Sequence, residues 1–217
     1  MKRTELASPT TQSAERVVQP FPGAVSDAAL VAAVRAGRLD AADQLFDRYG
    51  EYVERLIVRV LGLDAEVPDL INEVFARAFE RIERLEDAAA LKAWIGSIAV
   101  FTARSFLRDR RSRRRFLGFF APEELPEIPF SSVPVECSLA LLRTYQVLDK
   151  LPPDERIAFA LRFVDGMSLG EIAEVMHVSI GTVKRRLTRG RKRFVRAAER
   201  DPLLREHIQH SQRWGEP

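Results

Sequence analysis

Residues 168–187 read SLGEIAEVMHVSIGTVKRRL, and this stretch decides the fold of the second half of the chain. Ser168 and Glu171 have the spacing of a capping box, which predicts the start of a short helix. Ser179 predicts the N-cap of a second helix. Between the two helices, His177 lies at a turn that often needs a left-handed backbone, which histidine tolerates better than most residues. The stretch therefore predicts a helix-turn-helix unit.

The second helix of this unit has an apolar face and a polar, basic face. Its apolar positions recur at four, three and four residues: Val183, Leu187, Gly190 and Phe194. Its outward positions are Gly181, Arg185, Thr188 and Lys192, flanked by Lys184 and Arg189. Arginine can pair bidentately with guanine, and threonine can contact the thymine methyl, so this face suits the major groove. Phosphate contacts are predicted for Arg186, Arg191 and Arg193. An ordinary solvated basic face, or a metal ligand at His177, is the alternative.

Upstream of this unit the apolar spacing is helical throughout, from Asp27 to about Arg115. No segment alternates with a period of two residues, so the sequence predicts an all-α fold. Four prolines interrupt the helical rhythm and predict an extended linker: Pro122, Pro126, Pro129 and Pro134. We therefore expect two small helical domains joined by a Pro-rich linker, the second with the helix-turn-helix. The predicted limits are an N-terminal arm (1–26), a helical domain (27–116), the linker (117–137), the helix-turn-helix domain (138–200) and a solvated tail (201–217).

Composition restricts the compartment and the class of partner. The 217 residues contain one cysteine, Cys137, so an internal disulfide is excluded and a reducing cytoplasm is expected. The N-terminus lacks a signal-peptide core, and no apolar run of membrane-spanning length is apparent. Acids outnumber bases between residues 64 and 87, whereas residues 104–115 hold seven arginines and one aspartate. Opposed charge blocks indicate two kinds of partner, one of them nucleic acid.

The predicted helix that begins at Pro68 carries an acidic outward face: Asp69, Asn72, Glu73, Ala76, Glu80 and Glu83. DNA would repel this face, so it meets either solvent or a basic protein surface. Asp69 and Glu73, four residues apart, could instead hold Mg²⁺ in a helical hydrolase, although no lysine or histidine accompanies them as acid, base or phosphate clamp.

The next predicted helix interleaves arginines with aromatic residues. The stripe consists of Ser97, Phe101, Arg104, Arg108, Arg111 and Arg115, with Trp94 near its start. Bases stack on rings while arginines follow the backbone, so the pattern suits unstacked single-stranded DNA. The alternative is that Trp94 is a core residue.

Taken together, these segments resemble the extracytoplasmic-function (ECF) sigma factors of bacterial RNA polymerase. VPDLINEVFARAF (67–79) resembles region 2.2 of that family, and LKAWIGSIAVFTARSFLRDRRSRR (91–114) resembles regions 2.3 and 2.4. LPPDERIAFALRFVDGMSLGEIAEVMHVSIGTVKRRLTRGRKRF (151–194) resembles region 4. The likeness covers about residues 27–115 and 138–198.

The resemblance implies an alternative sigma factor, with no catalytic residue, metal or cofactor, that directs core polymerase to promoters and helps to melt them. It implies that the polymerase β′ clamp helices meet Asp69, Asn72, Glu73 and Phe75. It implies that the melted minus-ten element meets Lys92, Trp94, Ser97, Phe101, Arg104 and Arg108. It implies that the duplex minus-thirty-five element meets Thr182, Lys184, Arg185, Thr188 and Arg189. Further implied partners are the polymerase β flap and an anti-sigma factor, without insertion of this chain into the membrane.

This chain departs from the family's pattern at several positions. Val100 and Phe101 stand where an Arg-Asn pair is common, Ser105 stands where an aspartate is common, and Arg185 replaces a small residue. The middle domain and the self-inhibitory N-terminal region of longer sigma factors are missing, so external restraint by an anti-sigma factor is expected. A stand-alone helix-turn-helix regulator with a helical sensor or dimerisation domain is the alternative function.

Overall fold

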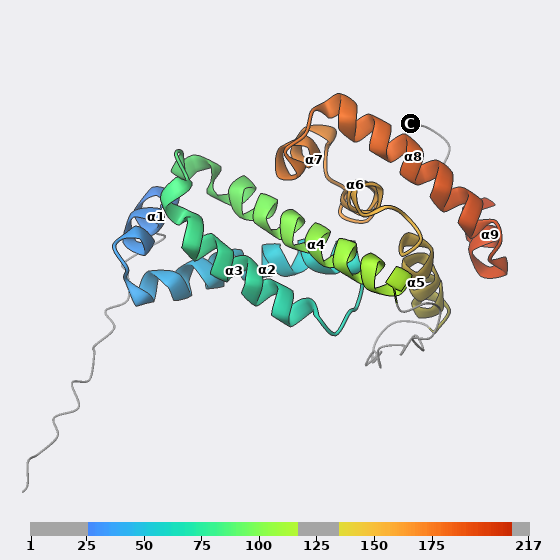
Figure 1. The fold of residues 1–217 in the computed structure, drawn as a ribbon, viewed down its shortest axis with the longest axis horizontal. Helices are drawn as coiled ribbons and strands as arrows, with labels where there is room; N and C mark the ends of the chain where they lie inside the picture. The colour runs from blue at the N-terminus through green and yellow to red at the C-terminus, as the bar shows by residue number, and fades with distance from the viewer. Residues whose placement is uncertain (1–25, 117–134, 210–217) are drawn as a thin grey trace, which may run out of the picture.

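The structure is a computed structural model that describes residues 26–116 and 135–209, and within these residues it is built from helices without a strand (Figure 1). The α-helices are α1 (Asp27–Arg35), α2 (Leu39–Leu61), α3 (Val67–Arg81), α4 (Leu91–Phe116), α5 (Val135–Leu148), α6 (Pro153–Phe163), α7 (Leu169–Met176), α8 (Ile180–Ala198) and α9 (Pro202–Gln209). Two 3₁₀ helices, η1 (Ile82–Arg84) and η2 (Ala88–Ala90), join α3 to α4. The predicted all-α fold is confirmed.

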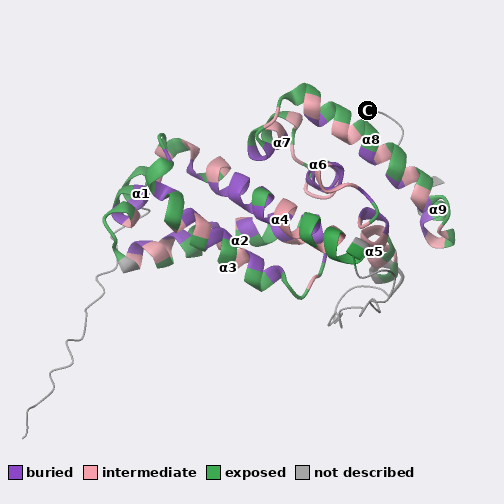
Figure 2. Ribbon diagram, in the orientation of Figure 1, coloured by how far each residue is buried: buried purple, intermediate pink, exposed green. Residues whose placement is uncertain are grey.

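Helices α1 to α4 form the N-terminal domain, in which α2, α3 and α4 pack on one another. The apolar stripes predicted for these helices line its core. Leu45, Val53 and Ile57 of α2 are fully buried, as are Leu91 and Ile95 of α4. Figure 2 shows that the buried residues of these helices lie on the sides facing one another. An amphipathic stripe at helical spacing therefore located the core correctly.

Local signals in the helix-turn-helix also have the predicted geometry. Ser168 Oγ accepts a hydrogen bond from the Glu171 amide at 3.2 Å, and the Glu171 carboxylate accepts one from the Ser168 amide at 2.8 Å. His177 ends α7 with φ 50° and ψ 52°, in the left-handed region. Ser179 Oγ accepts from the Thr182 amide at the start of α8. These features depend on residues within one helical turn, which explains why the sequence revealed them.

Helices α5 to α9 form the C-terminal domain, and both of its ends differ from the prediction. Helix α5 begins at Val135, three residues before the expected Ser138. Residues 202–209, expected to be a solvated tail, form α9, and Leu204 is buried in a small core with Leu148, Phe159 and Phe194. An eight-residue helix with only three apolar side chains besides its proline gives too weak a periodic signal to be separated from a tail. The predicted domain limits otherwise remain predictions, because residues 117–134 of the linker lie outside the described ranges.

The two helical domains also pack against each other, a contact that the sequence did not reveal. Helices α6 and α7 pack on α4, and α6, which is seen nearly end-on in Figure 1, also contacts α2. One apolar cluster runs through both domains. At Gly96 the helices approach so closely that an added Cβ would lie 3.2 Å from Val175 Cγ1 of α7 and 2.5 Å from Tyr52 Oη of α2. Helical periodicity shows that a face is apolar, but it does not show which element covers that face.

The C-terminal end of α2 is capped by side chains of the other domain. Arg156 of α6 donates to the carbonyls of Val60 at 2.8 Å and Leu61 at 3.1 Å, and Tyr145 of α5 donates to that of Arg59 at 3.1 Å. The last carbonyls of a helix lack intrahelical partners and carry negative partial charge, so a buried guanidinium suits this position.

The expectation that the sequence has no apolar run of membrane-spanning length is wrong for the segment that contains most of α4. The stretch Ala88–Arg114 is, by length and composition alone, apolar enough to cross a bilayer, although the sequence was expected to hold no such run. Within that stretch, 56% of the most apolar window is buried inside the fold, as in the core helix of a soluble protein. Its hydropathy is accounted for by packing against α2, α3, α6 and α7.

Candidate nucleic-acid and polymerase interfaces

The outward face of α8 presents the residues predicted to read duplex DNA. Lys184, Arg185, Thr188 and Arg189 are exposed, and Thr182 is half-buried. Thr182 Oγ1 lies 3.1 Å from Ser179 Oγ at the N-cap and accepts a hydrogen bond from Arg185 at 3.4 Å. The Thr188 hydroxyl donates to the Lys184 carbonyl at 2.9 Å. Through Thr182, the Arg185 side chain is therefore held toward the N-cap of its own helix.

The opposite face of α8 is held on α6 by close packing. Val183 and Phe194 are buried, as the phasing predicted, and the Phe194 ring stacks on Phe159 with centroids 4.8 Å apart. At Gly190 an added Cβ would lie 3.2 Å from the Glu155 carbonyl oxygen. A side chain there would push α8 away from the α6 backbone, which cannot shift easily. The absence of a side chain at Gly190 therefore sets the distance between α8 and α6.

Two of the three arginines predicted to contact phosphates are paired with carboxylates of α6. Arg186 lies 3.4 Å from Asp154, and Arg193 lies 3.1 Å from Glu155. Sequence reasoning placed them beside the outward face but could not see α6 beneath them. In this arrangement these two side chains contribute to the packing of α8.

The minus-ten candidates on α4 differ in exposure. Lys92 is exposed and lies 5.3 Å from the Tyr52 ring centroid, and Trp94 is half-buried. Ser97 is 8% exposed and donates its hydroxyl to the Trp94 carbonyl at 2.7 Å. Phe101 is 43% exposed, with the Arg77 guanidinium 5.2 Å from its ring centroid. The structure therefore leaves Lys92 and Phe101 open to a ligand and turns Ser97 to its own backbone.

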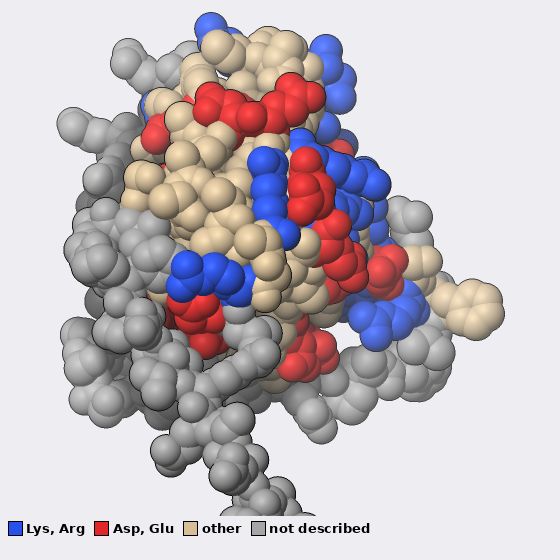
Figure 3. All heavy atoms as spheres, turned by 90° about the vertical axis from the view of Figure 1, so that its left-hand side faces the viewer, with Lys and Arg blue, Asp and Glu red and all other residues tan. Residues whose placement is uncertain are grey.

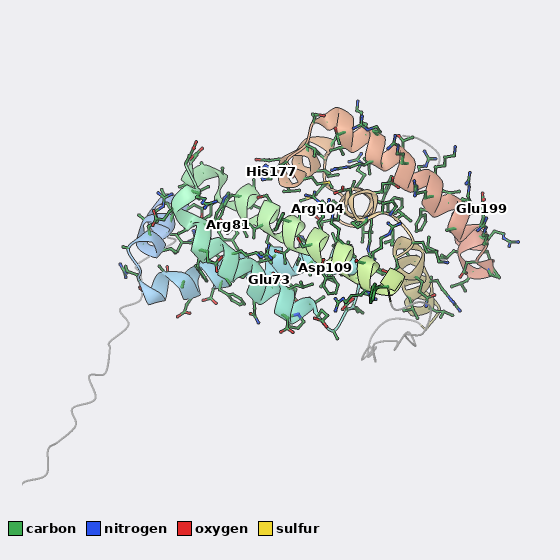
Figure 4. All side chains as sticks on the ribbon, in the orientation of Figure 1. Glu73, Arg81, Arg104, Asp109, His177 and Glu199 are labelled. Carbon is green, nitrogen blue, oxygen red and sulfur yellow. The ribbon has the colours of Figure 1, made fainter. Side chains whose placement is uncertain are left out.

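Arg104 and Arg108, the cationic members of that set, meet Asp154 at the start of α6. Arg104 Nε lies 2.8 Å and Arg108 Nη2 3.8 Å from the two Asp154 oxygens. Burial lowers the pKa of Arg104, and the negative charge of Asp154 opposes that shift. Figure 4 shows Arg104 on the side of α4 that faces α6.

The acidic face of α3 lies on the other side of α4 from the helix-turn-helix, as the labelled Glu73 and His177 show (Figure 4). Asp69, Asn72 and Glu73 are exposed, and Glu73 accepts a hydrogen bond from Arg77. Phe75, assigned to the same docking set, is 3% exposed and lies 4.7 Å from Phe46 between ring centroids. In this structure the Phe75 side chain packs in the core beneath α3, and its predicted contact with polymerase stays a prediction.

Not every surface of the molecule has a single sign of charge. The end formed by α1 and the start of α4 shows acidic and basic side chains next to one another (Figure 3). Such a face lacks the summed field that attracts a polyanion or a basic protein. The faces of interest are therefore those of α3, α4 and α8.

Residues 26–116 and 135–209 contain no group of three or more His, Cys, Asp or Glu side chains placed to hold a metal ion. The pair Asp69 and Glu73 thus lacks a third protein ligand there, and His177 is explained by its turn geometry.

Sequence reasoning missed Asp154 and Arg156 as structurally important residues. In the sequence, Asp154 is an acidic residue in the first turn of a helix, and the helix dipole alone is enough to favour an acid at that position. Arg156 is 2% exposed, and a signal for this was present: Phe159 and Ala160, three and four residues further on, are buried on the same helix face. Burial lowers the pKa of Arg156, and Asp149 opposes the shift.

Comparison with protein families matches the two domains separately. Residues 45–113 match the model of sigma-70 region 2, and residues 141–194 match that of sigma-70 region 4. The first match spans α3 and most of α2 and α4, and the second spans α6, α7 and most of α5 and α8.

Curated relatives match across both domains. The ECF RNA polymerase sigma-E factor of Haemophilus influenzae is 29% identical over 181 residues, covering 77% of this chain and 93% of that protein. The ECF RNA polymerase sigma-E factor of Escherichia coli K12 is 29% identical over 192 residues, covering 83% of this chain and 97% of that protein.

Solved structures share the fold. CnrH, solved in complex with the cytosolic domain of CnrY, aligns with a TM-score of 0.56 and 24% identity over 81% of this chain and 98% of its own. The sigma factor RpoE of Bartonella quintana, solved with the anti-sigma factor NepR, aligns with a TM-score of 0.52 and 21% identity over 73% of this chain and 97% of its own.

Proposed function

The chain belongs to the extracytoplasmic-function sigma factors of bacterial RNA polymerase, and from that premise we propose how its surfaces serve promoter recognition and transcription initiation. The exposed acids of α3 dock on the core enzyme. Helix α4 contacts the melted non-template strand at the minus-ten element, and the outward face of α8 reads the minus-thirty-five element as duplex. The polymerase performs the chemistry, and this chain is not itself an enzyme.

The observation that carries this proposal is the separation of two charged faces of opposite sign. Asp69 and Glu73 are exposed on α3, whereas Lys184, Arg185 and Arg189 are exposed on α8. A polyanion favours the second face and is repelled by the first, so DNA and a basic protein surface can bind at the same time without competing.

We infer further that the chain acts in the cytoplasm and that an anti-sigma protein binds it. The two structural neighbours support this, since CnrH is solved with the cytosolic domain of CnrY and the Bartonella RpoE with NepR. The buried stretch of α4 supports a protein that does not enter the membrane.

The test is transcription with purified core polymerase on genomic promoter fragments. We expect promoter-specific run-off transcripts from the wild-type chain. Asp69→Arg combined with Glu73→Arg should abolish association with core polymerase, because it reverses the charge of the docking face without touching the core. The matched control is Glu51→Arg with Glu54→Arg, which makes the same charge change on exposed positions of α2.

Retained polymerase binding by the folded α3 variant would contradict the docking assignment. The sigma function itself fails if the wild-type chain neither associates with core polymerase nor produces a promoter-specific transcript. Tight operator binding by the isolated chain at physiological salt, without polymerase, would instead favour a stand-alone regulator.

A further inference from the structure

A large apolar side chain is exposed at the very start of α8. Ile180 is the first residue of the helix, directly after the N-cap Ser179, and it is 48% exposed. No other large apolar residue of α6, α7 or α8, whose residues the structure all describes, is exposed to that degree. Val178, just before the cap, packs against the core. Packing within the domain therefore leaves half of Ile180 in solvent.

Ile180 shares one side of α8 with Lys184 and Thr188. The three residues follow one another at intervals of four, so their side chains lie one above another along the helix. Lys184 and Thr188 are exposed, and both belong to the face proposed to meet the minus-thirty-five duplex. Ile180 thus extends that face by one turn, toward the N-terminal end of the helix.

The N-terminal end of α8 is the part of a recognition helix that meets base edges. In helix-turn-helix proteins this helix lies in the major groove and its first residues contact the bases. Helix α8 begins beside α7, at the end of the domain away from α9 (Figure 1). Residues 179–181 and 184–185 are all exposed there. The position of Ile180 is therefore that of a base contact.

Gly181, the next residue, leaves room for a ligand beside Ile180. An added Cβ there would meet only Ser179 Oγ, at an ordinary contact distance of 3.9 Å. At Gly190, in contrast, an added Cβ would lie 3.2 Å from the Glu155 carbonyl oxygen. Packing inside the domain requires a glycine at 190 but not at 181. The missing side chain at Gly181 lets another molecule approach the backbone of α8 closely.

The surroundings of Ile180 indicate which chemical group it meets. Lys184, Arg185 and Arg189 are exposed on the same helix, so the isoleucine lies within a cationic surface that attracts a polyanion. In the major groove, base edges offer hydrogen-bond donors, hydrogen-bond acceptors and one apolar group, the C5 methyl of thymine. An aliphatic side chain cannot pair with the polar groups, but it can bury that methyl.

We infer that Ile180 is a specificity-determining residue of the minus-thirty-five reader and that it contacts the C5 methyl group of a thymine in the major groove. Lys184 and Arg185 then supply charge and hydrogen bonds, and Ile180 supplies a preference that depends on a methyl group. The inference rests on the proposed function, because it takes α8 to read duplex DNA.

The test removes a methyl group from the DNA without changing its hydrogen bonds. Core polymerase carrying this chain is bound to a promoter duplex selected in the transcription experiment above. Each thymine of the minus-thirty-five element is replaced in turn by deoxyuridine, which lacks only the C5 methyl, and affinity is measured by fluorescence anisotropy. For the wild-type chain we expect one position at which deoxyuridine weakens binding by about fourfold, the effect of one buried methyl group.

Ile180→Ala should weaken binding to the thymine duplex by at least about fourfold and bring the affinity ratio of thymine to deoxyuridine at that position close to one. Ile180→Val keeps a branched side chain and should retain most of the ratio. The matched control is Leu141→Ala on α5, which shortens an aliphatic side chain of similar exposure, 43%, and should leave the ratio at about fourfold. Melting temperatures check that each variant is folded.

Thr188→Ser tests the other methyl group on this side of α8. A deoxyuridine effect that persists in folded Ile180→Ala would overturn the inference, and its loss in Thr188→Ser would assign the thymine contact to Thr188 instead. A wild-type complex that responds to deoxyuridine at no position would also overturn it, with the proposed function intact. A wild-type chain that forms no promoter-specific complex with polymerase would refute the proposed function, and this inference with it.

Discussion

Helices α4 and α8 both carry predicted DNA contacts, but they differ in what surrounds their cations. Arg185 and Arg189 of α8 face solvent, and Arg185 donates a hydrogen bond to Thr182 of its own helix. Arg104 of α4 is turned into the other domain and meets Asp154. Helix α8 keeps the face that carries these arginines in solvent, whereas α4 packs on α2 and α3 and also on α6 and α7 of the other domain. The predictions below test that difference.

The largest effect is expected at Arg156, which holds α6, one of the helices that pack on α4, against the C-terminal end of α2. Arg156→Met leaves Asp149 without its buried partner and removes the donors to the Val60 and Leu61 carbonyls. Breaking one side of a buried ion pair costs about 3–5 kcal/mol. Urea unfolding should show that loss in the free energy of unfolding.

The control is Arg162→Met, on the same helix but exposed, where one hydrogen bond to the Met167 carbonyl is lost. It should cost no more than about 1 kcal/mol. If both variants are equally stable, the cap on α2 does not hold the domains together.

An intermediate effect is expected on α8. Arg185→Ala should weaken binding of the polymerase complex to its minus-thirty-five duplex by about 1–3 kcal/mol and relax the base preference at one position. Lys192→Ala, on the same exposed face, should weaken all sequences alike and lower the salt dependence instead. Fluorescence anisotropy over a set of single-base promoter variants distinguishes the two patterns; a uniform loss for Arg185→Ala would make it a phosphate contact.

The smallest effect is expected at alkaline pH, at the packing of α7 on α4. Burial raises the pKa of Tyr52 to about 12; Arg55 lowers it, and Asp165, Glu171 and Glu174 raise it further. Its folded pKa exceeds the unfolded value of about 10, so the stability from neutral Tyr52 is full below pH 10 and is lost as pH rises toward 12.

Tyr52→Phe should remove this component, so that the melting temperature of the variant falls less steeply than that of the wild type between pH 10 and 12. Tyr145→Phe is not a suitable control, because burial raises the pKa of that tyrosine as well. Identical alkaline profiles for wild type and Tyr52→Phe would show that α7 does not keep Tyr52 neutral.

Much of this protein was determined by the sequence alone, and the reason is that the relevant interactions are local. The capping box of Ser168 and Glu171, the left-handed His177 and the inward set around Val183 depend on neighbours within a few residues. The exposed acids of α3 and the exposed cations of α8 follow from helical phase, since the outward side of a two-sided helix is fixed by its apolar side.

Only the tertiary structure decided what lies over α4. Arg156 donates to a carbonyl 96 residues away, and Asp154 meets Arg104 and Arg186 from two other helices. Two phosphate candidates, Arg186 and Arg193, proved to be paired with carboxylates of α6, because such pairing depends on which elements meet. Periodicity identifies a buried face but carries no information about its distant partner, and for charged residues that partner decides whether the side chain is free to bind DNA.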